Sequence, residues 1–177
     1  MPRLPRPIFA SVVLAALAAP LSGVAQQQGA PQHGGMPGMD MHETKSGAPY
    51  RPGLGDLMTA FVQPRHIKLG LAGDAQNWPY AAYELGELRE AFDDVARLVP
   101  RHGTLAVPAA IAATVRPPLA ALDAAIKARD QAAFATAYGE LTASCNACHQ
   151  SADHPMIVIQ APTGAAFPDQ DFRPPKP

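Results

Sequence analysis

The stretch Gln131–Gln150, "QAAFATAYGELTASCNACHQ", decides the fold because its apolar residues recur at helical spacing. Successive members of this series stand four, three, four and three positions apart: Phe134, Tyr138, Leu141, Cys145 and Cys148. Such spacing predicts an amphipathic helix with one buried face. Asp130 immediately precedes the stretch and suits the N-cap position, since its carboxylate can accept hydrogen bonds from the first free N–H groups. The sequence therefore predicts a helix over 131–150 that carries both cysteines on its buried face.

The residues before this stretch show the same helical periodicity. Three more helices are expected, over 54–72, 78–99 and 108–129. Pro79 suits the first turn of the second of these, because an N–H at that position would have no partner within the helix. Strand-like alternation and Gly-rich hairpins are not evident in the sequence. An all-α fold is therefore expected, and short connections favour an antiparallel up-down four-helix bundle.

Several details of these helices follow from the same periodicity. On the first helix, the residues expected to face the core are Leu57, Met58, Phe61, Val62 and Leu69. Gly73 is expected to stop that helix, and Pro117-Pro118 are expected to kink or restart the third. The acidic residues of the second helix, including Glu84 and Glu87, are expected on its solvated face.

The N-terminal segment has the composition of a targeting sequence rather than of a folded core. Two basic residues, Arg3 and Arg6, precede an apolar run from Ile8 to Ala19, and small residues end at Ala25. This order predicts a secretory signal peptide over 1–25 and export to a periplasm. The apolar run is short for a retained membrane anchor, and no stable membrane span is expected elsewhere.

Two further segments flank the helical domain, which is expected over 52–152. Residues 26–51 are rich in Gly, Pro, Met and His and predict a flexible linker. Its thioethers and imidazoles are also candidate ligands for copper(I), a second hypothesis for this linker, with Met36, Met39 and Met41 as the residues to test. Residues 153–177 predict an extended Pro-rich tail, held to the domain at Met156–Ile159 and Phe167.

The overall charge excludes one class of partner. The formal net charge is −1 at pH 7 and no Lys/Arg patch stands out, so nucleic acid is not expected to bind. No paired carboxylates suggest acid–base catalysis, and the chain is not expected to be an enzyme.

The helix over 131–150 carries the motif Cys145-x-x-Cys148-His149. A c-type haem needs two thiols for its vinyl carbons and one imidazole for its iron, and side chains at i, i+3 and i+4 share one helix face. A thioredoxin-like dithiol would need a βαβ context, and a zinc site would need further ligands. The remaining alternatives are a chance pair of buried cysteines and a plain disulfide between them. The motif therefore predicts one covalent haem c.

The place of the motif in the chain narrows the class of protein. Only 28 residues follow His149, too few to wrap a haem, so the fold must be built from the residues before it. In this respect the sequence resembles the class II c-type cytochromes, the cytochrome c-prime family, whose C-x-x-C-H motif ends the last helix of a four-helix bundle. The resemblance covers Leu54–Ser151 and depends on "CNACH", with "LM" at Leu57-Met58 as weaker support. The sequence departs from the family pattern in its long Pro-rich tail, its Pro117-Pro118 pair and its Met/His-rich linker.

The resemblance implies roles for residues on both sides of the haem. His149 would be the proximal iron ligand, and the distal side would face the first helix. Met58 is the first candidate for the distal ligand, although a lone Met more commonly fills a gap in the core. His66 is the alternative, about 80° from Met58 around an ideal helix. Arg65 is a candidate for hydrogen bonds to a haem propionate.

Two functions remain open at this level. A ligated sixth position would suit single-electron transfer with a redox partner protein. An open sixth position would suit the binding or sensing of a small diffusible gas. A second copy of the chain, in a homodimer, is a further candidate partner.

Overall fold

A computed structural model describes residues 50–164 and 166–176 of the chain. The described residues all belong to one structural unit, residues 47–177. The predicted signal peptide and all but the last two residues of the predicted linker lie outside the described residues, and so does the proposed copper-binding Met cluster. The described part is mostly helical, which confirms the all-α class.

The first helical segment runs without a break through three elements. These are α1 (Leu54–Leu57), the π-helical turn η1 (Met58–Val62) and α2 (Gln63–Asp74). After a short turn, α3 extends over Trp78–Leu98, with Pro79 in its first turn as expected. Asn77 caps α3, because its side-chain oxygen accepts a hydrogen bond of 3.3 Å from the Tyr80 N–H.

A small hairpin separates α3 from the next helical segment. Strand β1 (Arg101–His102) pairs with β2 (Leu105–Ala106) in antiparallel register, and Gly103 takes a left-handed φ of +55° in the turn. The sequence prediction of no strands or hairpins was wrong here, because a ladder of two residues is too short to show alternation.

The third and fourth helical segments follow. The third comprises α4 (Val107–Ala110), a second π-helical turn η2 (Ile111–Val115) and α5 (Arg116–Ala128). Its proline pair lies in the first turn of α5, where it restarts the helix after η2. The last helix, α6, covers Gln131–Ser151. The predicted N-cap is confirmed, since Asp130 accepts hydrogen bonds of 3.0 Å from the N–H groups of Ala132 and Ala133.

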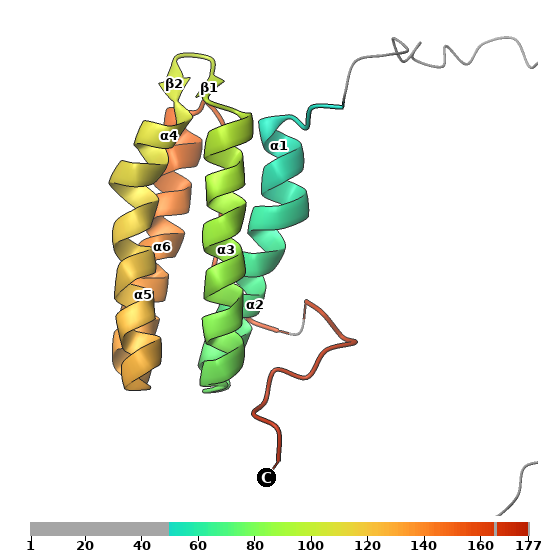
Figure 1. Cartoon of the computed structure of the whole chain (residues 1–177), viewed down its shortest axis with the longest axis vertical. Coiled ribbons are helices and arrows are strands. Elements are labelled where there is room, and N and C mark those ends of the chain that lie inside the picture. Colours follow the sequence, from blue (N-terminus) through green and yellow to red (C-terminus); the bar gives the residue numbers. More distant parts are fainter. Residues whose placement is uncertain (1–49, 165, 177) are drawn as a thin grey trace, which may run out of the picture. The chain divides into compact units, whose positions relative to one another are not determined.

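The helical segments enclose one apolar core. Within the described residues, α2 packs on α3, α3 on α5, α5 on α6, and α6 returns to α2. Figure 1 shows these segments side by side, with the β1–β2 hairpin at the end where α1 and α4 begin. The most deeply buried apolar side chains come from all of them: Leu69, Leu85, Leu88, Val95, Leu122, Phe134 and Leu141.

Phe61 and Glu84 reverse the predicted burial, while Met58, Cys145 and Cys148, which were expected to be buried, are half-buried. Phe61, expected in the core, is 54% exposed because it lies in η1, where the wider π turn shifts side chains away from the faces of an ideal α-helix. Glu84, expected on the solvated face of α3, is only 1% exposed. Its carboxylate is compensated by Arg65 of α2, whose Nη1 lies 3.3 Å from Glu84 Oε2.

The C-terminal tail returns along the helices and contacts them at intervals. Near α6 it is held by Asn146, and farther on the ring of Phe167 lies 4.7 Å below Lys68 Nζ. Near the start of α3, Phe172 stacks on Tyr80 with ring centroids 5.4 Å apart.

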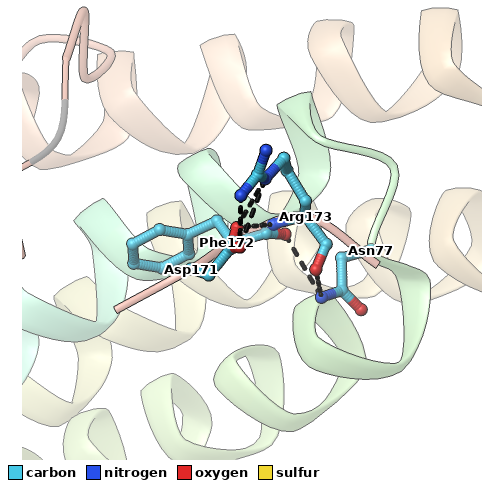
Figure 2. A network of polar contacts seen from close by, with 4 residues as sticks. All are labelled: Asn77, Asp171, Phe172 and Arg173. Atoms are coloured by element: carbon cyan, nitrogen blue, oxygen red, sulfur yellow. Dashed lines mark hydrogen bonds and ion pairs between the residues drawn. The ribbon is translucent and has the colours of Figure 1, made fainter. Parts of the chain in front are cut away.

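Figure 2 shows the last of these attachment points, where Asn77 Nδ2 donates to the main-chain oxygens of Phe172 and Arg173 at 3.2 and 3.1 Å. The described tail residues form no helix or strand, and the expectation of an extended tail stays a prediction. The attachment expected at Met156 and Val158 was wrong, because both side chains are largely exposed.

The stretch Val107–Ala128 is long and apolar enough to cross a membrane, with a mean hydropathy of 1.3 over its best window. From the sequence, no stretch after the predicted signal peptide was expected to be long and apolar enough for a membrane helix, and for length and composition this expectation was wrong. In the described structure its apolar face contributes to the core, through Ile111, Val115, Leu119, Leu122 and Ile126. A core helix satisfies the same composition test, so the stretch by itself is weak evidence for a membrane span.

Candidate functional site

A cavity of about 640 Å³ lies beside the C-terminal half of α6. Its wall combines residues from η1 and α2, from η2, from α6 and from the tail. Most of the wall is apolar, including Val62, Phe92, Ile111 and Val115. The polar and sulfur-bearing side chains that line it include the residues singled out from the sequence: Met58, His66, Cys145, Cys148 and His149. The fold therefore brings together the predicted thiols, the predicted proximal imidazole and both distal candidates.

The two cysteines follow one another by one turn of α6 and are both free thiols. Burial, with a smaller contribution from the neighbouring Cys148, raises the pKa of Cys145 to about 12. Burial also raises the pKa of Cys148. Catalytic dithiols have thiol pKa values lowered toward neutrality, so these environments do not favour the thioredoxin-like alternative.

His149 lies half-buried at the cavity wall with its ring orientation fixed. Its Nδ1 lies 2.9 Å from the main-chain oxygen of Ile157, eight residues farther along the chain. A carbonyl oxygen can only accept, so Nδ1–H is the donor, and in the neutral imidazole Nε2 then carries the lone pair. A histidine that ligates a metal commonly donates its other N–H in this way, to a carbonyl or carboxylate. The imidazole is thus held in the tautomer that a metal ligand needs.

His66 of α2 is 4% exposed, and both of its ring nitrogens have polar partners. Nδ1 lies 3.1 Å from Tyr138 Oη, and Nε2 lies 3.1 Å from Thr142 Oγ1. The ring also stacks on Tyr138, with centroids 4.7 Å apart. Burial lowers the pKa of His66 to about 4, so the ring is neutral at physiological pH.

Met58 of η1 is half-buried and lines the same cavity as His66. On an ideal α-helix the two residues would point about 80° apart. The π-helical turn η1 lies between them and contains about one residue more than an α-helical turn. All residues after η1 are therefore rotated back by about 100° around the helix axis, so that His66 points within about 20° of Met58. The rotation at η1 therefore explains why both candidate distal ligands line the same cavity.

Arg65, the candidate propionate contact, is engaged elsewhere. Its Nη2 lies 2.8 Å from Glu87 Oε2, in addition to the contact with Glu84. In the described structure Arg65 does not line the cavity. Its guanidinium joins α2 to α3 through these two carboxylates.

Sequence reasoning missed two histidines in the cavity wall. His102 of β1 and His154, just after α6, have ring centroids 5.5 Å apart. Helical periodicity could not predict the position of His102, because this residue lies in the β1–β2 hairpin and not in a helix. Within the described residues, no three or more His, Cys, Asp or Glu side chains are grouped to hold a metal ion. A closed zinc site, which needs four protein ligands, therefore has no support in the described part.

Comparisons with known proteins add no assignment: no family model, no curated protein and no solved structure matches this chain.

Proposed function

We propose that this chain is an exported c-type cytochrome of the class II kind, which holds one covalent haem c in the cavity beside α6 and passes single electrons. In this proposal the helical segments form an antiparallel up-down four-helix bundle. The observation that carries it is His149, whose Nδ1–H is committed to the Ile157 carbonyl while its Nε2 stays available at a cavity that also holds both thiols.

The residues present fit such a group. The cavity volume of about 640 Å³ lies within the usual range for sites that bury a ligand. An apolar wall suits the macrocycle, the two thiols suit thioether bonds, and a neutral imidazole suits iron. Both π-helical turns border the cavity, and π turns in helices are frequent at functional sites.

Each residue has a distinct part in this proposal. Cys145 and Cys148 attach the group to α6, and His149 supplies the proximal ligand. The bound haem iron would supply the one-electron chemistry, and the protein would set its potential by ligand identity and burial. No substrate has to bind, so the proposal does not include an enzymatic reaction.

Met58 is the better supported distal ligand. Ligation by His66 would cost its ring the contact with Thr142 or Tyr138 that now holds it in place. Both hydroxyls would keep a partner, because Thr142 donates to the Tyr138 carbonyl and Tyr138 donates to the His66 carbonyl. The thioether of Met58 has no such bond to lose. A His/Met pair favours a higher potential than a His/His pair, which suits an electron carrier.

The partner in this proposal is a redox protein, and the proposed location is the periplasm. The signal peptide, which lies outside the described residues, supports the location. Free thiols in an oxidising compartment would tend to oxidise, whereas thioether bonds to haem would protect both cysteines.

The test is to express the whole chain with its own leader in a bacterium that makes c-type cytochromes, and to stain for haem after denaturing electrophoresis. Covalent haem is expected in the exported protein and should be lost when Cys145→Ala is combined with Cys148→Ala. Met58→Ala serves as the control, because it leaves both attachment bonds in place. An exported wild-type protein without covalent haem would refute the proposal.

A further inference from the structure

The C-terminal tail forms one wall of the cavity. Residues from the turn after α6 onward line it: Ile157, Val158, Ile159, Gln160, Pro162 and Thr163. This wall has no secondary structure of its own, and Val158 is largely exposed. Ordering such a segment costs roughly 1–2 kcal/mol per residue in backbone entropy, so specific contacts must hold it in place.

Asn146 provides the most complete of these contacts. Its Nδ2 donates to the Ile159 carbonyl at 3.0 Å, while its Oδ1 accepts from the Ile159 N–H at 2.7 Å. The amide side chain thus satisfies both main-chain groups of one tail residue, as a neighbouring strand would. In the described part of the chain, the next side-chain hydrogen bonds between tail and helices occur at Gln170 and Phe172, near the start of α3.

The same turn of α6 grips the tail at a second point. Asn146 lies between the two cysteines, and His149 lies three residues after it. The two tail residues that they hold, Ile159 and Ile157, are likewise close together in the chain. Because only one residue separates them, the hydrogen bonds that hold Ile159 also restrict the position of the Ile157 carbonyl. That carbonyl accepts the hydrogen bond from His149 Nδ1–H.

We infer that Asn146 is a positioning residue, which clamps the tail over the cavity so that the Ile157 carbonyl holds the imidazole of His149 and the tail keeps water out. The part of this inference that concerns the haem depends on the proposed function. The clamp itself concerns only residues of this chain and can be measured separately.

The first experiment compares haem-loaded wild type with Asn146→Ala. Without the clamp, tail cleavage between Met156 and Gln160 by a protease is expected to become about tenfold faster, because two hydrogen bonds no longer oppose local opening. Exchange of the His149 Nδ1 proton, followed by NMR in the reduced protein, is expected to accelerate as well. Ser144→Ala is the matched control, since Ser144 is on the same helix and donates only to the Glu140 carbonyl.

Unchanged cleavage and unchanged Nδ1 proton exchange in haem-loaded Asn146→Ala would overturn the inference. A second measurement does not depend on any variant. Amide hydrogen exchange in the wild-type protein is expected to show a slow Ile159 N–H beside a fast Val158 N–H, and equal rates would overturn the clamp. Absence of haem from the wild-type protein would instead refute the proposed function, while the amide exchange test of the clamp would still apply.

Discussion

Gly73 of α2 and the ring of Phe134 on α6 are in such close contact that a β-carbon at position 73 would overlap the ring carbons. Phe134 is almost fully buried and continues a row of aromatic rings. It meets Trp78 edge-on at 6.0 Å and stacks on Tyr138 at 5.9 Å, and Tyr138 in turn stacks on His66. The packing of Gly73 therefore connects the turn between α2 and α3 with the wall of the cavity.

Gly73→Ala is expected to destabilise the protein by about 1–3 kcal/mol, because the added methyl group forces Phe134 out of its place. Urea unfolding of the purified full chain measures the change. Gly86→Ala is the matched control: it is also within a helix, and a β-carbon there meets nothing within 4 Å. That variant is expected to be neutral or more stable, by up to about 1 kcal/mol. Equal free energies of unfolding for the two variants would contradict the close packing of Gly73 against Phe134.

Gly73 also shows what helix signals can and cannot predict. The end of the first helical segment was placed correctly to within two residues, but for a different reason, since α2 continues through Gly73 to Asp74. The left-handed residue after the helix is Gln76, with a φ of 56°. A glycine required by a close neighbour 61 positions away cannot be distinguished from a glycine that stops a helix without knowledge of the packing.

The burial of Glu84 makes the Arg65 ion pair important for stability. Arg65→Ala is expected to cost about 3 kcal/mol, because it leaves a carboxylate that is 1% exposed without its partner. Chemical denaturation measures this loss. The exposed pair Arg97–Asp94 is the control, and Arg97→Ala is expected to cost less than about 1 kcal/mol.

The same variant tests the predicted propionate contact. Because Arg65 points to α3 in this structure, Arg65→Ala is expected to leave the absorption spectrum and the potential of the loaded protein largely unchanged. A large shift in potential without a loss of stability would indicate that Arg65 turns toward the haem instead.

His66 is expected to make stability depend on pH below neutrality. Burial lowers its pKa to about 4 from an ordinary value of 6.5, so the unfolded chain binds a proton in this interval that the folded protein does not. The free energy of unfolding is therefore unaffected by titration of His66 above about pH 6.5, and it decreases as the pH falls from 6.5 toward 4, because protonation favours the unfolded chain. The largest effect is about 3 kcal/mol.

Unfolding measured between pH 7 and pH 4 should thus show a shallower slope in His66→Gln than in wild type. His102→Gln is the comparison, because its ring is also at the cavity but only half-buried. An identical slope in wild type and His66→Gln would contradict a buried neutral His66.

The sequence predicted both thiols of the cavity wall and three further side chains that line it, namely Met58, His66 and His149, and its shortfalls have physical causes. The phase of 131–150 placed the thiols and the imidazole together, because a regular helix repeats every 3.6 residues. The same rule failed at Phe61 and separated Met58 from His66, since it assumes that no π turn intervenes. The tail could not be placed at all from periodicity, because hydrogen bonds such as Asn146 to Ile159 leave no repeat in the sequence.

The identity of the distal ligand decides between the two functions considered from the sequence. If Met58 ligates the iron, Met58→Ala is expected to convert a low-spin absorption spectrum to a high-spin one and to allow carbon monoxide to bind the reduced protein. Met156→Ala is the control, because Met156 is 75% exposed on the tail and should leave the spectrum unchanged. A low-spin spectrum that survives Met58→Ala would transfer the ligand role to His66, whose ring would then give up its contact with Thr142 or Tyr138. Ready binding of carbon monoxide by the wild-type protein would mean an open sixth position and would favour gas binding over electron transfer.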